Sequence, residues 1–75
     1  MEPRDMAIFV RVVEDGDFSA AARTLSLTPS TVSKSIARLE DQLGRRLLQR
    51  SSRTMRLTPE GQHFLEAAHR VLDAL

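Results

Sequence analysis

Two stretches with helical periodicity follow each other in the middle of the sequence, with an unusually short link between them. The apolar residues of the first stretch lie three or four positions apart: Phe18, Ala21, Ala22 and Leu25. The second stretch has the same spacing: Val32, Ile36, Leu39 and Leu43. Between them, Ser26 and Leu27 precede Thr28-Pro29, a pair typical of a helix N-cap and first helical position. Two helices joined this tightly predict a helix-turn-helix unit over residues 18–37.

The segments on either side extend this unit. An apolar stripe predicts a helix from Pro3 to Val13, which a glycine-containing turn over residues 14–17 ends. Ser19 is the predicted N-cap of the second helix. The third helix is predicted to end at Gly44. The first 44 residues therefore predict a core of three helices.

Beyond Gly44 the helical pattern stops. The apolar pairs Leu47/Leu48 and Met55/Leu57 enclose a polar segment, which indicates a short two-stranded hairpin over residues 46–57. A second Thr-Pro pair at residues 58 and 59 then opens a fourth helix. The predicted fold is mainly α: a winged helix-turn-helix domain over residues 1–58, with a three-helix core and a two-stranded wing, followed by the start of a linker helix over residues 59–75.

Basic side chains are concentrated in one part of the chain. Residues 31–58 carry seven Lys or Arg and two Asp or Glu, whereas residues 1–30 and 59–75 each carry two more acidic than basic side chains. Six of the seven central cations are arginine, whose planar guanidinium matches phosphates and guanine edges. The regional excess favours a nucleic-acid partner; the alternative is an ordinary solvated charged face.

Other classes of protein lack support in the sequence. The absence of cysteine excludes disulfides and thiolate metal sites and agrees with a reducing cytosol. The longest apolar run, Met6 to Val10, is too short to cross a bilayer, so no membrane partner is expected. His63 and His69 do not share a helix face, and no serine has a histidine and a carboxylate arranged beside it. We therefore expect no enzyme activity, no cofactor and no metal.

The third helix carries the main functional signal. If its apolar stripe faces the core, helical rotation leaves a small, polar, slightly basic surface outside: Ser30, Lys34, Ala37 and Asp41, with Thr31, Ser33 and Arg38 on the flanks. Short side chains let the helix backbone approach base edges, and hydroxyls and Lys34 pair with bases or phosphates. The helix N-terminus at Thr28 and Pro29 offers N–H groups to a phosphate. This surface predicts that helix 29–43 enters the major groove of double-stranded DNA.

The predicted hairpin adds a second basic surface. Its tip carries Arg50 and Arg53, and the negative potential of the minor groove attracts arginine. The alternative is simple exposure of these side chains to solvent. Arg45 and Arg46 are expected at phosphates or in water.

The fourth helix has a seam of apolar residues at coiled-coil spacing: Phe64, Ala68, Val71 and Leu75, with Leu65 and Leu72 beside them. Part of this stripe must cover the domain. The remainder is more apolar than a lone surface helix needs, which favours dimerisation. The seam is shorter than two heptads, so packing against the chain's own domain is the alternative.

Two segments, FSAAARTLSLTPSTVSKSIARLEDQLG and LLQRSSRTMRLTPEG, carry a resemblance to a known family through their order and spacing. They resemble the N-terminal winged helix-turn-helix domain of LysR-type transcriptional regulators. The resemblance implies sequence-specific binding of a double-stranded DNA operator in the bacterial cytoplasm, and a homodimer formed by the linker helix. It places two sets of residues at DNA: Pro29, Ser30, Thr31, Ser33 and Lys34 in or beside the major groove, and Arg50 and Arg53 at the minor groove or its phosphates.

The chain departs from the family pattern at three places. Leu48 stands where the family usually has Phe, which implies a weaker anchor for the hairpin. Pro29-Ser30 replaces a frequent Gln-Pro pair and removes a glutamine able to read adenine. Ser26 occupies a turn position that favours Gly or Asn, which costs about 1 kcal/mol if the position needs positive φ.

The resemblance also implies a longer C-terminal domain that senses a small-molecule co-inducer. That domain is absent from these 75 residues, so we expect the chain to be a fragment whose DNA binding does not respond to metabolites. The competing hypothesis is a winged-helix protein-interaction or dimerisation module without a nucleic-acid role, against which the basic central segment argues. RNA binding is less favoured, because exposed stacking aromatics are not expected.

Overall fold

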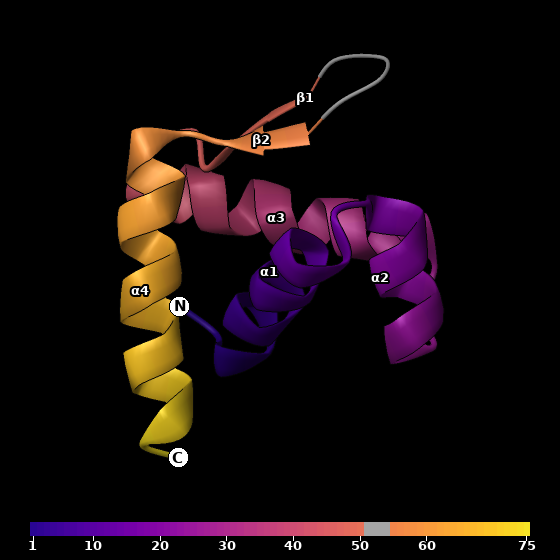
Figure 1. Cartoon of the computed structure of the whole chain (residues 1–75), viewed down its shortest axis with the longest axis horizontal. Coiled ribbons are helices and arrows are strands. Elements are labelled where there is room, and N and C mark those ends of the chain that lie inside the picture. Colours follow the sequence, from indigo (N-terminus) through magenta and orange to yellow (C-terminus); the bar gives the residue numbers. More distant parts are fainter. Residues whose placement is uncertain (51–54) are drawn as a thin grey trace.

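The protein's structure, a computed structural model, describes residues 1–50 and 55–75. Its helices and strands follow each other in the predicted order (Figure 1): α1 (Pro3–Asp15), α2 (Phe18–Leu25), α3 (Pro29–Leu43), β1 (Leu48–Arg50), β2 (Met55–Leu57) and α4 (Pro59–Asp73). This is the mainly α, winged helix-turn-helix architecture predicted from the sequence. Arg53, which is one of the predicted DNA contacts, lies outside the described residues.

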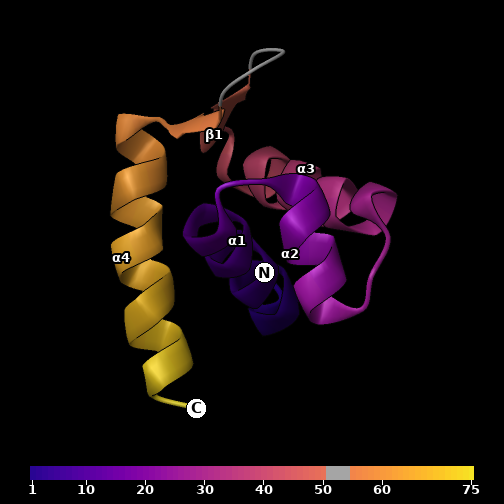
Figure 2. The ribbon, with the colours of Figure 1, turned by 45° about the vertical axis from the view of Figure 1, so that its right-hand side comes forward.

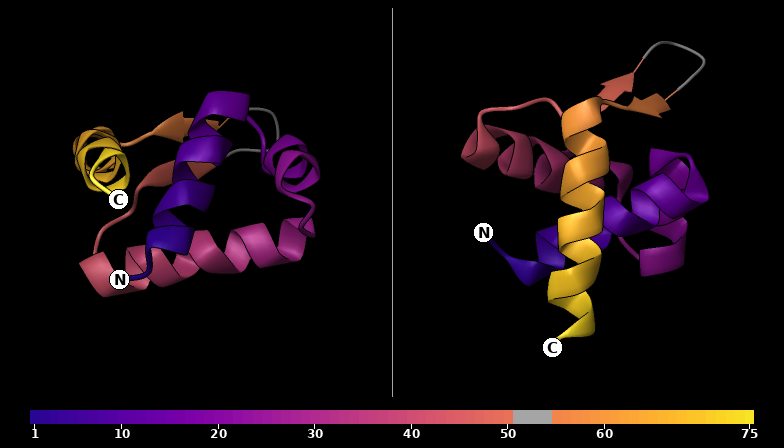
Figure 3. Two further views of the ribbon diagram at one scale, coloured as in Figure 1. Left: turned by 90° about the horizontal axis from the view of Figure 1, so that it is seen from below. Right: turned by 60° about the vertical axis from the view of Figure 1, so that its left-hand side comes forward.

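Helix α1 is the centre of the fold. It packs against α2, α3 and α4, and it separates α2 from α4, which lie on opposite sides of it (Figure 1 and Figure 2). Its inward residues Phe9 and Val12 are fully buried, and the Phe9 ring meets Phe64 of α4 edge to face with centroids 5.4 Å apart. Seen along α4, α1 starts beside α3 and runs away from it across the molecule (Figure 3, left). The core is thus built around one central helix.

Local capping fixes where each helix begins. Thr28 caps α3 by accepting a hydrogen bond from the Thr31 N–H at 3.1 Å, and Thr58 caps α4 by accepting one from the Gly61 N–H at 2.9 Å. Both Thr-Pro predictions are therefore confirmed. The predicted cap at Ser19 is wrong: the cap is Asp17, two residues earlier, and α2 begins at Phe18, because the Asp17 carboxylate accepts from the Ala20 N–H at 3.0 Å. A carboxylate next to the turn is the stronger acceptor and also suits the positive helix end.

The turn between α2 and α3 requires the unusual conformation considered for Ser26. This residue has φ 57° and ψ 42°, and among the described residues it is the only non-glycine with positive φ. The Leu27 N–H then donates to the Ala22 carbonyl at 2.8 Å and closes the end of α2. The left-handed backbone at a residue with a Cβ costs about 1 kcal/mol, which packing of α2 and α3 must offset.

The wing is an antiparallel pair of three-residue strands. Leu48 pairs with Leu57, Gln49 with Arg56, and Arg50 with Met55. Strand β1 begins two residues after the predicted start of the hairpin at residue 46, because the Leu47 N–H bonds to Glu40 and not to a neighbouring strand. The Leu47 and Leu48 N–H groups donate to one Glu40 carboxylate oxygen at 2.8 and 3.3 Å. Leu48 is 4% exposed, so the aliphatic residue at this position is part of the core.

A compact joint connects the wing to α4. The Thr58 hydroxyl donates to the Arg46 carbonyl at 2.6 Å, and the Thr58 N–H donates to the Leu47 carbonyl at 3.0 Å. Gly61, one turn into α4, comes so close to the Leu47 backbone that a Cβ there would overlap its carbonyl oxygen. The chain before the wing and the start of α4 are thereby fixed together.

Candidate nucleic-acid interface

The outer surface of α3 has the composition expected from its helical rotation. Val32 and Leu39 are fully buried and Ile36 is 4% exposed, whereas Leu43 is half-buried against the core. On the opposite side the exposed residues are small or polar: Ser30, Lys34, Ala37 and Asp41. Thr31 and Ser33 are half-buried on the flanks. A helix with this surface can approach a duplex closely, because no long apolar side chain stands in the way.

The N-terminus of α3 is exposed at Thr28, Pro29 and Ser30. The Thr28 and Thr31 hydroxyl oxygens lie 2.9 Å apart, so one donates to the other. This contact uses only one of the two hydroxyl hydrogens, so the other can donate to an anion, and the positive end of the fifteen-residue α3 dipole lies here. This end of the helix therefore suits an anionic partner such as a phosphate.

Arg38, one of the predicted DNA contacts, is held by the protein itself. Its guanidinium donates to both carboxylate oxygens of Asp5, at 2.8 and 3.0 Å, and reaches the Ser35 hydroxyl at 3.5 Å. Asp5 is 2% exposed, whereas the Arg38 side chain remains 52% exposed. The hydrogen bond from Arg38 lowers the pKa of Asp5 below its usual value, against the opposing effect of burial, and the same contact raises the pKa of Arg38.

The Asp5–Arg38 pair changes what Arg38 can do. Both of its carboxylate-facing donors are engaged, so the remaining edge of the guanidinium is what it can offer to a partner. The pair also ties the N-terminal turn of α1 to the middle of α3. The contact between Asp5 and Arg38 could not be predicted from the sequence, because residues 33 positions apart give no periodic signal.

Arg50 is held in a different way. At the end of β1, its guanidinium carbon lies 4.3 Å from the centroid of the Phe18 ring, at the start of α2. A cation over an aromatic face is attracted by the ring quadrupole. Arg46 instead forms an ion pair with Glu40 at 3.5 Å, and its side chain is 81% exposed. The wing arginine is therefore directed by α2, a contact that sequence spacing did not indicate.

A cavity of about 280 Å³ lies between α3 and the base of the wing. Its wall combines residues of three elements: Phe18 of α2, Ser33, Ala37 and Glu40 of α3, and Leu48 and Arg50 of β1. The outer surface of α3 and the wing arginine thus meet on one side of the molecule. The predicted residues Ser33 and Arg50 are brought together there.

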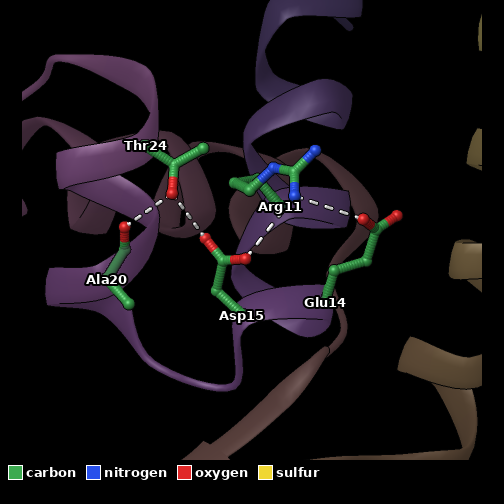
Figure 4. A network of polar contacts seen from close by, with 5 residues as sticks. All are labelled: Arg11, Glu14, Asp15, Ala20 and Thr24. Carbon is green, nitrogen blue, oxygen red and sulfur yellow. Dashed lines mark hydrogen bonds and ion pairs between the residues drawn. The ribbon is translucent and has the colours of Figure 1, made fainter.

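A network of polar contacts joins α2 to α1 (Figure 4). The Thr24 hydroxyl of α2 donates to the Asp15 carboxylate of α1 at 3.0 Å, and Asp15 also accepts from Arg11 at 3.5 Å. Arg11 lies 3.3 Å from Glu14 as well. These contacts orient α2, the first helix of the helix-turn-helix unit. The position of Phe18, at the start of α2, depends on this orientation.

The predicted dimerisation residues of α4 divide into two groups. Ala68 is fully buried and Phe64 is half-buried against Phe9, so both belong to the domain's own core. Val71 is 41% exposed and Leu75 is 82% exposed, while Leu72 is half-buried. The C-terminal part of α4 points away from the wing (Figure 1 and Figure 3, right). Among the described residues, the one other large apolar side chain that is exposed is Met1 at the N-terminus.

Within residues 1–50 and 55–75, no helix is both long enough and apolar enough to span a bilayer. The same part of the chain contains no group of three or more His, Asp or Glu side chains arranged to hold a metal ion.

Comparisons with known proteins agree with this geometry. The family described as "Bacterial regulatory helix-turn-helix protein, lysR family" matches residues 3–62. The "Probable HTH-type transcriptional regulator LtrA" of Klebsiella pneumoniae is 46% identical over 70 residues, which are 93% of this chain and 23% of that protein. "HTH-type transcriptional regulator CrgA" of Neisseria meningitidis serogroup B is 42% identical over 71 residues, 95% of this chain and 24% of that protein. The chain therefore spans about a quarter of the length of these relatives.

Solved structures superpose closely on the whole chain. "Crystal structure of CbnR_DBD-DNA complex" has a TM-score of 0.95 and 39% identity, and covers 99% of this chain and 85% of its own. "Crystal Structure of BenM_DBD/catB site 1 DNA Complex" has a TM-score of 0.93 and 40% identity, with 99% and 83% covered. Similarity at this level extends to the wing and to α4 as well as to the helix-turn-helix unit.

Proposed function

Since this chain belongs to the LysR family of bacterial helix-turn-helix regulators, we propose that it is a sequence-specific, double-stranded DNA-binding domain of a transcription regulator. The observation that carries the proposal is the meeting of α3's small polar surface with the wing arginine around one cavity. Two structures of high similarity, described as DNA complexes, support it. The protein acts as a regulator and not as an enzyme.

In this proposal, α3 lies in the major groove. Ser30, Ser33 and Lys34 contact base edges, and Thr28, Pro29 and Thr31 contact the adjoining phosphate at the helix N-terminus. Arg38 contributes through the edge of its guanidinium that Asp5 does not occupy. The arginines of the wing, Arg50 and Arg53, contact the neighbouring minor groove or its phosphates.

We propose further that two copies pair through the C-terminal part of α4. Support comes from the exposed Val71 and Leu75, which no described part of the chain covers. Phe64, Ala68 and Leu72 support the same helix from within the domain. A two-fold dimer would present two α3 helices to an operator with two half-sites.

Regulation by a small molecule lies outside this chain in the proposal. The relatives are about four times longer than the matched segment, which leaves room for a sensing domain. The DNA affinity of the 75 residues should therefore be the same with and without metabolites. As a DNA-binding regulator, the protein would act in the bacterial cytoplasm.

The direct experiment is a titration of mixed-sequence duplex DNA at several salt concentrations, followed by selection of bound duplexes from a random pool. Binding should weaken steeply with salt, because each phosphate contact releases counterions, and one sequence should be enriched. Absent or salt-independent binding would favour the alternative function, a winged-helix protein-interaction module. Binding without enrichment would remove sequence specificity from the proposal.

A further inference from the structure

We propose that the cavity between α3 and the wing is the seat of one backbone phosphate, and that Phe18 is a positioning residue that holds Arg50 at its rim. The proposal rests on DNA binding as proposed above. It assigns Arg50 to a phosphate in preference to a base, and it gives a binding function to an aromatic residue that would otherwise count only as core.

The cavity has the position that a phosphate requires. Its lining includes Ser33 and Ala37 of α3 and Arg50 of β1, and Arg46, between these two elements, lines it as well. When α3 occupies the major groove and the wing reaches the next minor groove, the strand that separates these grooves must pass between them. The only part of that strand able to reach a recess between two protein elements is its phosphodiester backbone.

Phe18 fixes the direction of Arg50. The guanidinium lies over the ring at 4.3 Å, so one of its faces is covered, and it forms no side-chain hydrogen bond to another residue within 1–50 and 55–75. Guanidinium donors lie in the plane of the group and match two phosphate oxygens at once. A free arginine side chain loses considerable rotamer entropy on binding, and prior stacking on Phe18 reduces that loss. Ser33, which also lines the cavity, adds a hydroxyl able to donate.

Glu40 lines the same cavity, and its negative charge would repel a phosphate if no other group compensated it. One carboxylate oxygen accepts from the Leu47 and Leu48 N–H groups, and the other pairs with Arg46. Its side chain is only 13% exposed. The charge of Glu40 is thus compensated from within the protein. Among the described residues no carboxylate forms an ion pair with Arg50, which leaves this cation for the phosphate.

The phosphate can be located by neutralising the DNA one position at a time. We would replace each phosphate of a selected duplex by an uncharged methylphosphonate and titrate the protein against the series. The wild-type protein should lose about tenfold in affinity at one particular position beside the α3 half-site. Arg50→Ala should bind the unmodified duplex about tenfold more weakly, with a shallower salt slope, and should lose nothing more at that position.

The positioning function of Phe18 is tested by three variants. Phe18→Leu keeps an apolar side chain but removes the aromatic face, and should weaken binding about two- to fivefold. Phe18→Tyr keeps the face and should bind like the wild type. In an Arg50→Ala background, Phe18→Leu should have no further effect. Thermal unfolding of each variant separates loss of binding from loss of folding.

Three results would overturn the inference while leaving DNA binding intact. The first is a methylphosphonate profile in which Arg50→Ala loses as much at every position as the wild type. The second is a loss of sequence preference in Arg50→Ala, which would place Arg50 at a base. The third is an equal effect of Phe18→Leu with and without Arg50. Failure of the wild-type protein to bind any duplex would instead contradict the proposed function.

Discussion

Helices α3 and α4 begin alike and end up with opposite surfaces. Both have fifteen residues, and both start with a threonine cap and a proline. Helix α3 places its aliphatic residues in or against the core and leaves small and polar groups outside. Helix α4 buries Ala68 and then leaves Val71 and Leu75 exposed near its end. The first surface suits a hydrated, anionic duplex, and the second suits another protein surface.

The largest expected effect comes from filling the α3 surface. Ala37→Glu places a long acidic side chain on the exposed side of α3, where it would meet the phosphates. Affinity for a selected duplex should fall by about 3 kcal/mol, or roughly a hundredfold, because like charges across an interface cost several kcal/mol. A filter-binding or fluorescence titration measures this change. Ala7→Glu is the matched control, since Ala7 is also exposed on a helix but lies on α1. Equal losses in both variants would remove the distinction between the surfaces.

The next effect concerns the α4 surface. Val71→Asp combined with Leu75→Asp should convert a dimer to monomers, because two charges replace the exposed apolar pair. Sedimentation should show the change in mass. Affinity for a two-site operator should fall by about 2 kcal/mol, while affinity for a single half-site stays the same. Gln62→Asp with His69→Asp puts two charges on exposed polar positions of the same helix and should leave the mass unchanged. An unchanged mass in the first variant would end the proposal for α4.

A third test concerns the link between α1 and α3. Asp5→Asn removes the charge that holds Arg38 and should lower the midpoint of thermal unfolding by about 5–10 °C at pH 7. Glu14→Gln is the control, because its ion pair with Arg11 is exposed and should contribute little. A midpoint for Asp5→Asn within 1–2 °C of the wild type, roughly as for a surface pair, would contradict the importance of this link.

The same pair predicts a pH dependence. Arg38 lowers the pKa of Asp5 below its usual value of 3.8, so the folded state favours the ionised carboxylate. The stabilisation is complete above the unfolded-state pKa and is lost as the pH falls through the lower, folded-state pKa. The difference in midpoint between wild type and Asp5→Asn should therefore be constant near neutrality and shrink in acid below pH 3.8. A difference that grows in acid would contradict the direction of the shift.

The smallest expected effect is in the turn between α2 and α3, which positions α3 and has no contact with α4. Ser26→Gly relieves the left-handed backbone and should raise the free energy of unfolding by about 1 kcal/mol. Denaturant unfolding measures this gain. Ser19→Gly, at an exposed position within α2, should have the opposite sign, because glycine destabilises a helix. A loss of stability in Ser26→Gly would show that the Ser26 side chain contributes more than its backbone costs.

The sequence was sufficient for features that arise from local chemistry. Apolar spacing gave the inward side of α3, and the two Thr-Pro pairs gave the starts of α3 and α4. A regional excess of arginine identified the basic part of the chain. These signals are readable because each depends on residues within one or two helical turns of each other.

Contacts between distant residues could not be predicted in this way. The Asp5–Arg38 pair, the Phe18–Arg50 contact and the Glu40 bonds to the start of β1 join separate elements. Their geometry depends on how the helices cross, which the spacing of apolar residues does not determine. The predicted cap at Ser19 failed for a different, local reason: Asp17 ends the predicted turn over residues 14–17, and its carboxylate is a better acceptor than the Ser19 hydroxyl.

The central claim is that the α3 surface, and not the α4 surface, lies against the duplex. The chain contains no cysteine, so Ser30→Cys and Val71→Cys can each carry a single iron-EDTA group that cleaves nearby DNA. The label at position 30 should cut within the selected half-site, and the label at position 71 should leave it intact. Cleavage from position 71 together with an uncut half-site from position 30 would contradict the account.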